Sequence, residues 1–280
     1  MQIKKNKLVA PVLKWVGGKR QLLDVLTPLL PGKFTTYCEP FVGGGALLFE
    51  LQPETAYVND INKELIRVYE VIKDDVEALI IALEDFKNEA GYFYHVRDWD
   101  RDKAKYAALP EIQKAARTLY LNKTCYNGLF RVNSAGDFNS PFGSYRNPNI
   151  VNAPTLRAVS SYLNAAAVRL TSIDYAEVFQ TLPKGSFVYI DPPYDPVSDT
   201  SSFTGYARGG FSRGEQIRLR ESCDELHKKG LKFMLSNSAT DFIKEQYAAY
   251  HITVVQAKRA INSNGAKRGE VDEVVVRNYE

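Results

Sequence analysis

The sequence predicts an α/β fold built on a parallel sheet, into which a second module is inserted. Short apolar segments alternate with segments of helical periodicity near both ends of the 280-residue chain, and this alternation is typical of parallel sheets. From residue 86 to residue 165 the alternation stops. We therefore expect one domain formed by residues 1–85 and 166–280, with residues 86–165 as the insert.

The first elements of the sheet are expected before residue 86. The segment TTYCEPFVGGG indicates a short strand that runs into a glycine-rich turn, and ALLFELQ then begins a helix. TAYVND indicates a second short strand. The segment NKELIRVYEVIKDDVEALIIALEDF that follows has helical periodicity, with Asn62 as a plausible N-cap.

The insert begins where this pattern ends. It contains the helical segment EIQKAARTLYLNK and then TCYNGLFRVNSAGDFNSPFGSYRNPNI, which is irregular and rich in Asn, Gly and aromatic residues. A long irregular segment of this kind is unusual inside a compact sheet domain and is often functional. We therefore interpret residues 86–165 as a separate module.

The sheet is expected to resume after the insert, with apolar strands in GSFVYIDPPY and LKFMLSNS. Between them, Ser212 and Glu215 have the spacing of a capping box at a helix N-terminus. The sequence at residues 228–230, Lys-Lys-Gly, suits the C-terminus of that helix. Four residues are expected on its apolar side: Ile217, Leu219, Cys223 and Leu226.

The composition, with 45% hydrophobic and 25% charged residues, is that of an ordinary globular protein. No apolar run approaches the length of a membrane span, and the first residues lack the apolar core of a secretory signal, so a cytoplasmic protein without a membrane partner is expected. The three cysteines, Cys38, Cys125 and Cys223, are scattered and lie apart from the histidines. We therefore expect no bound metal.

The net charge of +3 does not by itself predict a nucleic-acid partner. The distribution of charge is more informative, because residues 1–20 contain six Lys and Arg residues and no acid. This basic segment could contact phosphate or could simply be a solvated terminus, and the sequence favours neither interpretation.

The glycine-rich turn, with Gly43 and Gly45, lies between an expected strand and an expected helix, where a ligand can approach the backbone closely. A tight turn without a ligand would use the same glycines. Asp60 lies 17 positions after Gly43, at the end of the next expected strand. An acid near this spacing binds ribose hydroxyls in nucleotide-binding folds, although it could instead be only a helix cap.

The residues after the turn separate the candidate cofactors. Leu48 occupies the place of the third glycine of a dinucleotide fingerprint, and the chain has no G-x-x-x-x-G-K-[ST] loop. NAD and ATP are therefore disfavoured. A nucleoside cofactor without pyrophosphate, such as S-adenosylmethionine, would use the same turn and the same acid.

The most informative stretch is FVYIDPPYDP, residues 187–196. Asp191 follows an apolar strand, so its carboxylate is expected at the carboxyl end of the sheet, where ligands bind in open α/β folds. Pro192 and Pro193 stiffen the loop and lack N–H groups, which leaves carbonyls as acceptors. Tyr194 adds an aromatic face. Together these groups suit a flat ligand with an exocyclic amino group, whereas a proline-rich turn without function is the simpler alternative.

Several motifs in one order make the chain resemble a known family. PVLKWVGGKRQLL, EPFVGGGALLFEL, VND, TSIDY and DPPY, with the insert before TSIDY, closely resemble the Dam/DpnM family of DNA adenine-N6 methyltransferases. The resemblance runs from about residue 11 to the C-terminus and includes RVNSAGDFNSPFG and TSSFTGYARGGFS. It implies a Rossmann-like sheet of S-adenosylmethionine-dependent methyltransferases with an inserted, mostly helical DNA-recognition module that contains a hairpin.

The resemblance also implies roles for individual residues. Asp191 and the Pro192 carbonyl would accept hydrogen bonds from the amino group of a flipped-out adenine, and Tyr194 would stack on the base. Asp60 would bind the cofactor's ribose, and Asp174 with Tyr175 its adenine. The full set of cofactor residues is Trp15, Lys19, Glu39, Phe41, Gly43, Gly45, Asp60, Asp174, Tyr175 and Asp191, and the catalytic loop is Asp191, Pro192, Pro193 and Tyr194. Without the resemblance, Trp15 is equally a buried anchor and Lys19 a surface charge.

In the insert, CYNGLFRVN and FNSPFGSYRNP resemble the family's target-recognition hairpin. Arg131 is expected to recognise a guanine, because a guanidinium fits its O6 and N7 atoms. Lys123 is expected to contact phosphate, and Pro141 a thymine methyl. The expected DNA-binding residues are Lys123, Tyr126, Asn127, Leu129, Arg131, Asn133, Pro141 and Tyr145. The resemblance of the hairpin implies GATC in duplex DNA as the target.

Two other functions stay open. Related Asp/Asn-Pro-Pro-Tyr loops also serve RNA methylation, so structured RNA is an alternative acceptor. An inactive DNA-binding descendant of the fold is the second alternative, which the intact residues Asp191 to Tyr194 disfavour. The sequence also leaves open whether the protein works with a restriction endonuclease and whether its origin is a bacterial cell or a phage.

Overall fold

The computed structural model describes residues 5–15, 17–197, 211–258 and 270–280. Within these residues, seven strands form one sheet in the order β3-β2-β1-β4-β5-β7-β6. Strands β1 to β5 are parallel, and β7 runs antiparallel to both β5 and β6. The strands are β1 (Thr36–Glu39), β2 (Thr55–Asn59), β3 (Ala167–Thr171), β4 (Ser186–Ile190), β5 (Lys232–Ser238), β6 (His251–Lys258) and β7 (Glu270–Arg277). The predicted α/β fold with a Rossmann-like sheet is confirmed.

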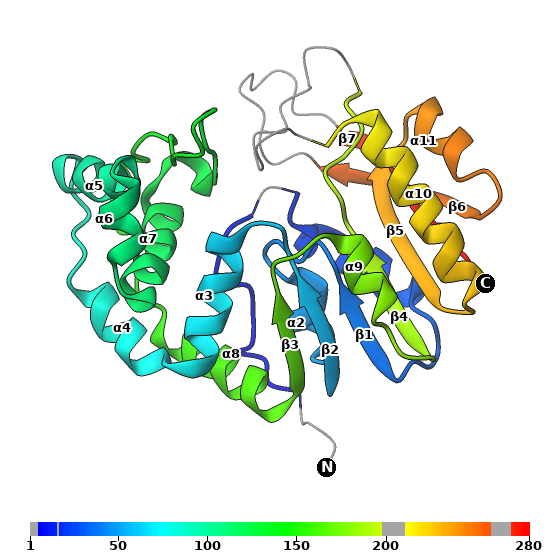
Figure 1. The fold of residues 1–280 in the computed structure, drawn as a ribbon, viewed down its shortest axis with the longest axis horizontal. Helices are drawn as coiled ribbons and strands as arrows, with labels where there is room; N and C mark the ends of the chain where they lie inside the picture. The colour runs from blue at the N-terminus through cyan, green and yellow to red at the C-terminus, as the bar shows by residue number, and fades with distance from the viewer. Residues whose placement is uncertain (1–4, 16, 198–210, 259–269) are drawn as a thin grey trace.

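Helices cover the sheet on both faces, and a further group of helices lies beyond its β3 edge (Figure 1). The α-helices are α1 (Leu23–Leu26), α2 (Ala46–Leu51), α3 (Lys63–Asp74), α4 (Val76–Glu84), α5 (Ala90–Arg97), α6 (Lys103–Ala108), α7 (Glu111–Thr124), α8 (Ala153–Ala165), α9 (Tyr175–Gln180), α10 (Arg213–Lys228) and α11 (Asp241–Gln246). The short 3-10 helices are η1 (Lys19–Leu22), η2 (Thr27–Leu29), η3 (Asp98–Arg101) and η4 (Tyr126–Gly128). No helix in the described part of the chain is long and apolar enough to span a bilayer.

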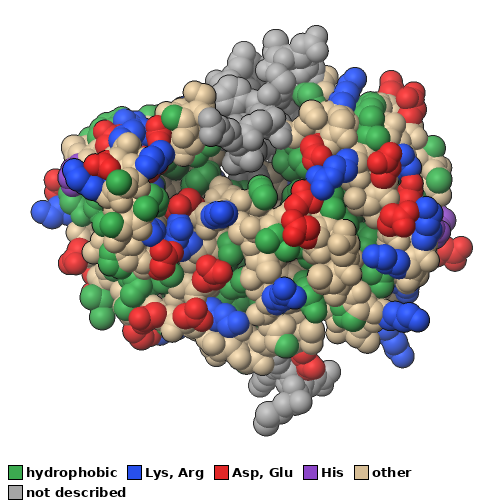
Figure 2. Space-filling view, in the orientation of Figure 1, with side chains coloured by type: hydrophobic (Ala, Val, Ile, Leu, Met, Phe, Trp, Pro, Cys, Tyr) green, Lys and Arg blue, Asp and Glu red, His purple; other side chains and the backbone are tan. Residues whose placement is uncertain are grey.

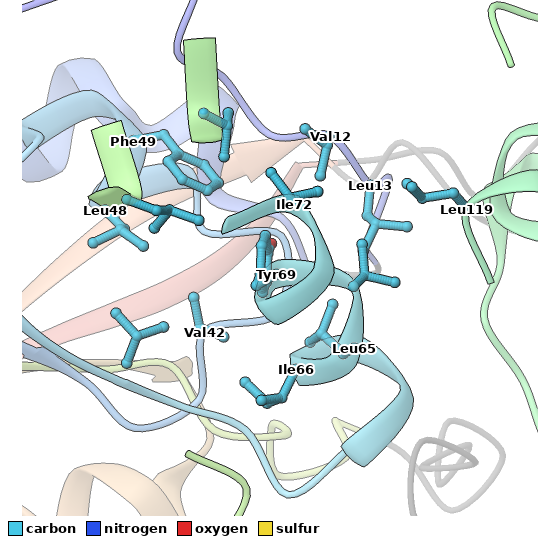
Figure 3. Close-up of a cluster of buried hydrophobic side chains, with 14 of the residues drawn as sticks. Val12, Leu13, Val42, Leu48, Phe49, Leu65, Ile66, Tyr69, Ile72 and Leu119 are labelled. Carbon is cyan, nitrogen blue, oxygen red and sulfur yellow. The ribbon is translucent and has the colours of Figure 1, made fainter. Parts of the chain in front are cut away.

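The sheet is buried on both faces because alternate residues of each strand point to opposite sides. On β4, Phe187 and Tyr189 belong to one apolar cluster, whereas Val188 and Ile190 belong to the other. The first cluster includes α3, whose Tyr69 lies among apolar side chains from several segments in Figure 3. Those labelled there are Val12, Leu13, Val42, Leu48, Phe49, Leu65, Ile66, Ile72 and Leu119.

Two helix N-caps predicted from the sequence are confirmed. The Asn62 side chain accepts a hydrogen bond from the Leu65 N–H, and the Ser212 hydroxyl accepts one from the Glu215 N–H, as predicted. The long helical segment after Asn62 is divided, because Asp75 ends α3 and its carboxylate caps α4.

The predicted apolar side of α10 is wrong at one position. Leu219, Cys223 and Leu226 are buried, but Ile217 is 38% exposed and its neighbour Gln216 is buried instead. Positions 216, 219, 223 and 226 share one face at helical spacing, whereas position 217 lies about 100° away from position 216. A polar side chain therefore occupies the innermost face of this helix.

The insert contains a hairpin between α7 and α8. Isolated antiparallel bridges pair Cys125 with Phe142 and Val132 with Phe138. The RVNSAGDFN segment turns within this pairing, because the Asn133 N–H bonds the Asp137 carbonyl at 2.9 Å. Helix α8 packs on α3 and β3, so the boundaries of the insert at residues 86 and 165 stay a prediction. Residues 200–210, within the motif TSSFTGYARGGFS, lie outside the described residues.

Candidate active site

The candidate site lies at the carboxyl edge of the parallel strands, where β1 lies between β2 and β4. After β1 the chain continues to β2 and β3 on one side of it, and then crosses to β4 on the other side. The strand order therefore reverses between β1 and β4. Ligands of open α/β sheets bind at such a point. At this edge Glu39 ends β1, Asp60 and Asp191 directly follow β2 and β4, and Asp174 lies three residues after the end of β3.

A buried asparagine holds three of the loops at this edge together. The Asn59 side-chain amide donates to the carbonyls of Pro40 and Ile173, at 3.1 and 3.0 Å. Its oxygen accepts from the Ile173 N–H and the Thr171 hydroxyl, at 3.0 and 2.9 Å. The loops that follow β1, β2 and β3 are thereby fixed relative to one another by a side chain that is only 1% exposed.

The glycine-rich turn is held from several sides. The Gly43 N–H donates to the Asp60 carboxylate at 3.0 Å, and the Tyr69 hydroxyl donates to the Gly43 carbonyl at 2.9 Å. Gly43 and Gly45 have φ angles of +47° and +67°, in the left-handed region that favours glycine. A Cβ at Gly43 would lie 2.7 Å from Cδ1 of Trp15. The turn therefore needs glycine both for its backbone conformation and for the approach of Trp15.

Lys19 and Asp191 form an ion pair with a 2.9 Å distance between Nζ and Oδ1. The interpretation of Lys19 as a surface charge is wrong, because its side chain is 5% exposed. The ammonium also donates to the Gly17 carbonyl and lies 4.6 Å from the ring centroid of Tyr194. Tyr194 in turn donates its hydroxyl hydrogen bond to Glu273 on β7, at 2.8 Å.

Three carboxyl groups at this edge have raised pKa values. Burial raises the pKa of Asp191 to about 6, a rise that the Lys19 ammonium limits and the Glu273 charge increases. Burial also raises the pKa of Asp60 to about 6, against hydrogen bonds from the Asn62 and Gly43 backbone that lower it. Burial raises the pKa of Glu39 to about 8, and the nearby Asp191 adds to that rise. Shifts of this kind are frequent at functional sites.

Aromatic rings lie beside the loop after β3. Tyr175 packs against Phe41 with 5.2 Å between ring centroids, and its hydroxyl is buried without a hydrogen-bond partner among the described residues. Asp174 caps α9 and pairs with Arg218, at 2.6 Å between Oδ1 and Nη2. The Arg218 guanidinium also lies 4.9 Å from the Tyr175 ring centroid and lowers the pKa of Asp174.

The hairpin presents several of the predicted DNA-binding residues to solvent. Tyr126, Asn133, Pro141 and Tyr145 are exposed, and the others, Lys123, Asn127, Leu129 and Arg131, are partly exposed. The Arg131 Nε donates to the Asn139 side chain at 2.7 Å, and its Nη2 donates to the Asn139 carbonyl at 3.2 Å. Asn139 therefore holds one edge of the guanidinium and leaves the Nη1 end for another partner.

The base of the hairpin is attached to the segment that carries Trp15. The Asn122 side chain accepts from the Lys14 N–H and donates to the Lys14 and Gly128 carbonyls, at 2.8, 2.8 and 3.1 Å. Trp15 stacks on Phe130 of the hairpin at 5.1 Å between centroids. A chain of contacts thus connects the hairpin to the glycine-rich turn through Trp15.

The structure brings the cofactor candidates and the Asp191 loop together at one edge, and places most of the hairpin candidates in the segment between α7 and α8. Sequence reasoning missed polar residues that hold these parts. Asn59, Asn122 and Gln216 are buried, and Glu273 is partly exposed. Two of them could have been found from the sequence. Asn59 lies inside the motif VND, and Gln216 has the helical spacing of a core residue. Charges of both signs are interspersed on the face in Figure 2, without a single basic patch.

Comparisons with known proteins give the class of the chain. It matches the family described as D12 class N6 adenine-specific DNA methyltransferase over residues 15–261. It is 41% identical over 280 residues to the Type II methyltransferase M1.LlaDCHI of Lactococcus lactis subsp. cremoris, covering 99% of this chain and 98% of that relative. It is 41% identical over 291 residues to the Type II methyltransferase M.MjaIII of Methanocaldococcus jannaschii, covering 97% and 99%.

A DNA adenine methylase of Escherichia coli (strain K12) is 33% identical over 277 residues, covering 98% of this chain and 95% of the relative. The chain therefore belongs to the D12 class N6 adenine-specific DNA methyltransferases, and the predicted family is confirmed. Nowhere in the described ranges do three or more His, Cys, Asp or Glu side chains gather as metal ligands could.

The raised pKa of Glu39 predicts a pH-dependent stability. Between its ordinary pKa near 4.5 and its folded value of about 8, only the folded state holds the proton. The free energy of unfolding therefore falls as pH rises through this window. Glu39→Gln keeps an acceptor for the Tyr37 hydroxyl but has no charge. Its free energy of unfolding should therefore rise relative to that of the wild type by up to about 1.4 kcal/mol per pH unit.

Urea unfolding of both proteins without cofactor, from pH 5 to pH 8, measures this difference. Glu221→Gln, at a side chain that is 63% exposed, is the matched control and should show no such trend. A constant difference between Glu39→Gln and the wild type across the window would contradict the prediction.

Proposed function

We propose that this protein transfers the methyl group of S-adenosylmethionine to the N6 atom of a flipped-out adenine in duplex DNA, within the sequence GATC. The observation that carries the proposal is the Asp191-Pro-Pro-Tyr194 loop at the strand-order reversal, with its carboxylate held 2.9 Å from the Lys19 ammonium. This placement puts an acceptor carboxylate, proline carbonyls and an aromatic ring at the ligand-binding edge of the fold.

The residues at this edge fit S-adenosylmethionine. Gly43 and Gly45 have positive φ angles and carry no side chain, and their turn leads directly into the start of α2. The Asp60 oxygens, each with one backbone N–H bond, retain lone pairs for ribose hydroxyls. The buried Tyr175 hydroxyl lacks a partner among the described residues, and the Phe41 and Tyr175 rings offer apolar faces for an adenine. When bound, the cofactor would supply an electrophilic sulfonium methyl group.

The Asp191 loop would act on the target base. The Asp191 carboxylate and the Pro192 carbonyl would accept hydrogen bonds from the adenine amino group, which favours its nitrogen lone pair as a nucleophile. Tyr194 would stack on the extruded base. As the nitrogen gains the methyl group it loses one proton, which Asp191 would hold in passing to solvent. The residues thus mainly align the nitrogen with the methyl carbon.

The insert would recognise the target sequence. Residues 86–165 would form the recognition module, with Arg131 contacting guanine O6 and N7 through its free Nη1 end. Lys123, whose pKa is lowered by burial, would contact phosphate only as the side chain extends from its partly buried position. The Trp15 to Phe130 stack would connect this module to the cofactor site.

The proposal predicts where labelled methyl groups appear. Labelled S-adenosylmethionine is incubated with a duplex that contains one GATC and with three comparison acceptors. These are the same duplex with N6-methylated adenine, a duplex with the outer guanine replaced, and ribosomal RNA. Label is expected only in the first. Label in the guanine-replaced duplex would remove the GATC assignment, label in RNA alone would favour an RNA acceptor, and cofactor binding without any label would favour an inactive DNA-binding protein.

Loss of the carboxylate is predicted to remove catalysis. Asp191→Ala should fold and bind duplex DNA, but its kcat should fall by about 100-fold or more, because a charged group that acts mainly in the transition state is lost. In the wild type, kcat/KM should decline as pH falls through about 6, where Asp191 takes up a proton and loses its negative charge, which makes it a weaker acceptor. Asp241→Ala, at an exposed position of α11, is the control. A near-normal kcat in Asp191→Ala would sink the assignment.

Arg131 is predicted to determine one guanine of the target. Arg131→Ala should reduce discrimination at that position by about 1–3 kcal/mol, measured as the ratio of kcat/KM for GATC and guanine-substituted duplexes. Arg131→Lys keeps the positive charge but loses the planar fork, so it should lose discrimination as well. If the lysine variant discriminates as well as the wild type, Arg131 contacts phosphate instead.

A further inference from the structure

The Asp191 loop cannot be fixed through its own prolines, because Pro192 and Pro193 have no N–H to donate. The structure instead supplies a donor from helix α10. The Gln216 side-chain amide donates to the Pro193 carbonyl at 2.8 Å, and Gln216 is only 1% exposed. The Pro193 carbonyl is thereby engaged from the protein interior.

Gln216 is itself oriented by a second buried amide. The Asn237 Nδ2 donates to the Gln216 Oε1 at 3.1 Å, which assigns the donor end of Gln216 to Pro193. The Asn237 oxygen accepts from the Asp195 N–H at 3.1 Å. Asn237 is fully buried on β5. Two neighbouring peptide groups, those that contain the Pro193 carbonyl and the Asp195 N–H, are therefore held by one pair of amides.

Asp195 secures the far end of the loop. The Ser238 hydroxyl donates to its carbonyl at 2.7 Å, and the Thr240 hydroxyl donates to its carboxylate at 2.8 Å. Arg213 Nε lies 3.1 Å from the same carboxylate, which is 1% exposed. The loop is therefore held at three places: Asp191 by Lys19, the Pro193 carbonyl by Gln216, and Asp195 by the contacts just described.

We propose that Gln216 is a positioning residue for methyl transfer, acting through the Pro193 carbonyl. This inference rests on the proposed function. The Pro193 carbonyl and the Tyr194 N–H belong to the same peptide group. The Gln216 hydrogen bond therefore fixes the backbone of Tyr194, whose ring would stack on the base. It also occupies the second of the two proline carbonyls, so that the amino group of the base is directed to the Asp191 carboxylate and the Pro192 carbonyl.

Gln216→Met tests this role, because methionine is similar in length and has no donor. The variant should bind S-adenosylmethionine and the GATC duplex within about threefold of the wild type, whereas kcat should fall by about 100-fold, since a misplacement of about 1 Å near the reacting atoms has such an effect. Equilibrium binding, circular dichroism and single-turnover methyl transfer at saturating duplex and cofactor provide these readouts.

Cys223→Ala is the matched control. Cys223 lies on the same face of α10, is fully buried and packs in an apolar cluster. A structural role of the helix alone would lower the methyl-transfer rate equally in both variants, and this result would overturn the inference, as would a wild-type rate in Gln216→Met.

Ser238→Ala provides an independent test if Gln216→Met does not fold. It removes only the hydroxyl that holds the Asp195 carbonyl, and a tenfold lower kcat with unchanged binding is expected, about the effect of one lost hydrogen bond. A wild-type rate in Ser238→Ala would then overturn the proposal that the loop is positioned from β5 and α10. An inactive wild type would refute the proposed function itself and this inference with it, whereas an active wild type beside unaffected variants would refute the inference alone.

Discussion

The ion pair between Lys19 and Asp191 joins the parts of this protein on which its chemistry depends. It connects the segment after Trp15 to the end of β4, at 2.9 Å and with little solvent access. A buried ion pair is favourable only where its geometry is good and further hydrogen bonds satisfy its partners. The Gly17 carbonyl and the Tyr194 ring provide such contacts to the ammonium. Trp15 in turn packs on Phe130, so the segment that carries Lys19 also contacts the hairpin.

The same region contains more acid than base, which defines the kind of ligand that it favours. Glu39, Asp60 and Asp191 have raised pKa values mainly because burial removes them from water, and the charges of Asp191 and Asp60 raise the pKa of Glu39 further. A cationic ligand beside such carboxyl groups stabilises their charged forms. The positive sulfonium of the proposed cofactor fits this requirement. Cofactor binding and the ionisation of Asp191 are therefore expected to be linked.

Much of the fold was predictable because its signals are local. An apolar run that ends in proline or aspartate marks a strand and the loop at its carboxyl end, and β1, β2 and β4 follow this pattern. The caps at Asn62 and Ser212 were predictable for the same reason, since a cap lies within four residues of the N–H that it binds. The candidate ligand groups of the site follow these strands directly. Parallel strands bring their carboxyl ends to one edge, so the gathering of Asp60 and Asp191 was also predictable.

The sequence by itself determined the strand ends, the catalytic loop motif and the family resemblance, which are all patterns of neighbouring residues. Only the tertiary structure decided which polar side chains become buried between those parts. Lys19 appeared to be a surface charge and Gln216 was passed over in favour of Ile217, yet both are buried against the Asp191 loop. Their partners lie 172 and 23 positions away in the chain, from Lys19 to Asp191 and from Gln216 to Pro193. Hydrogen bonds and ion pairs over such separations depend on how the chain packs, which no local pattern specifies.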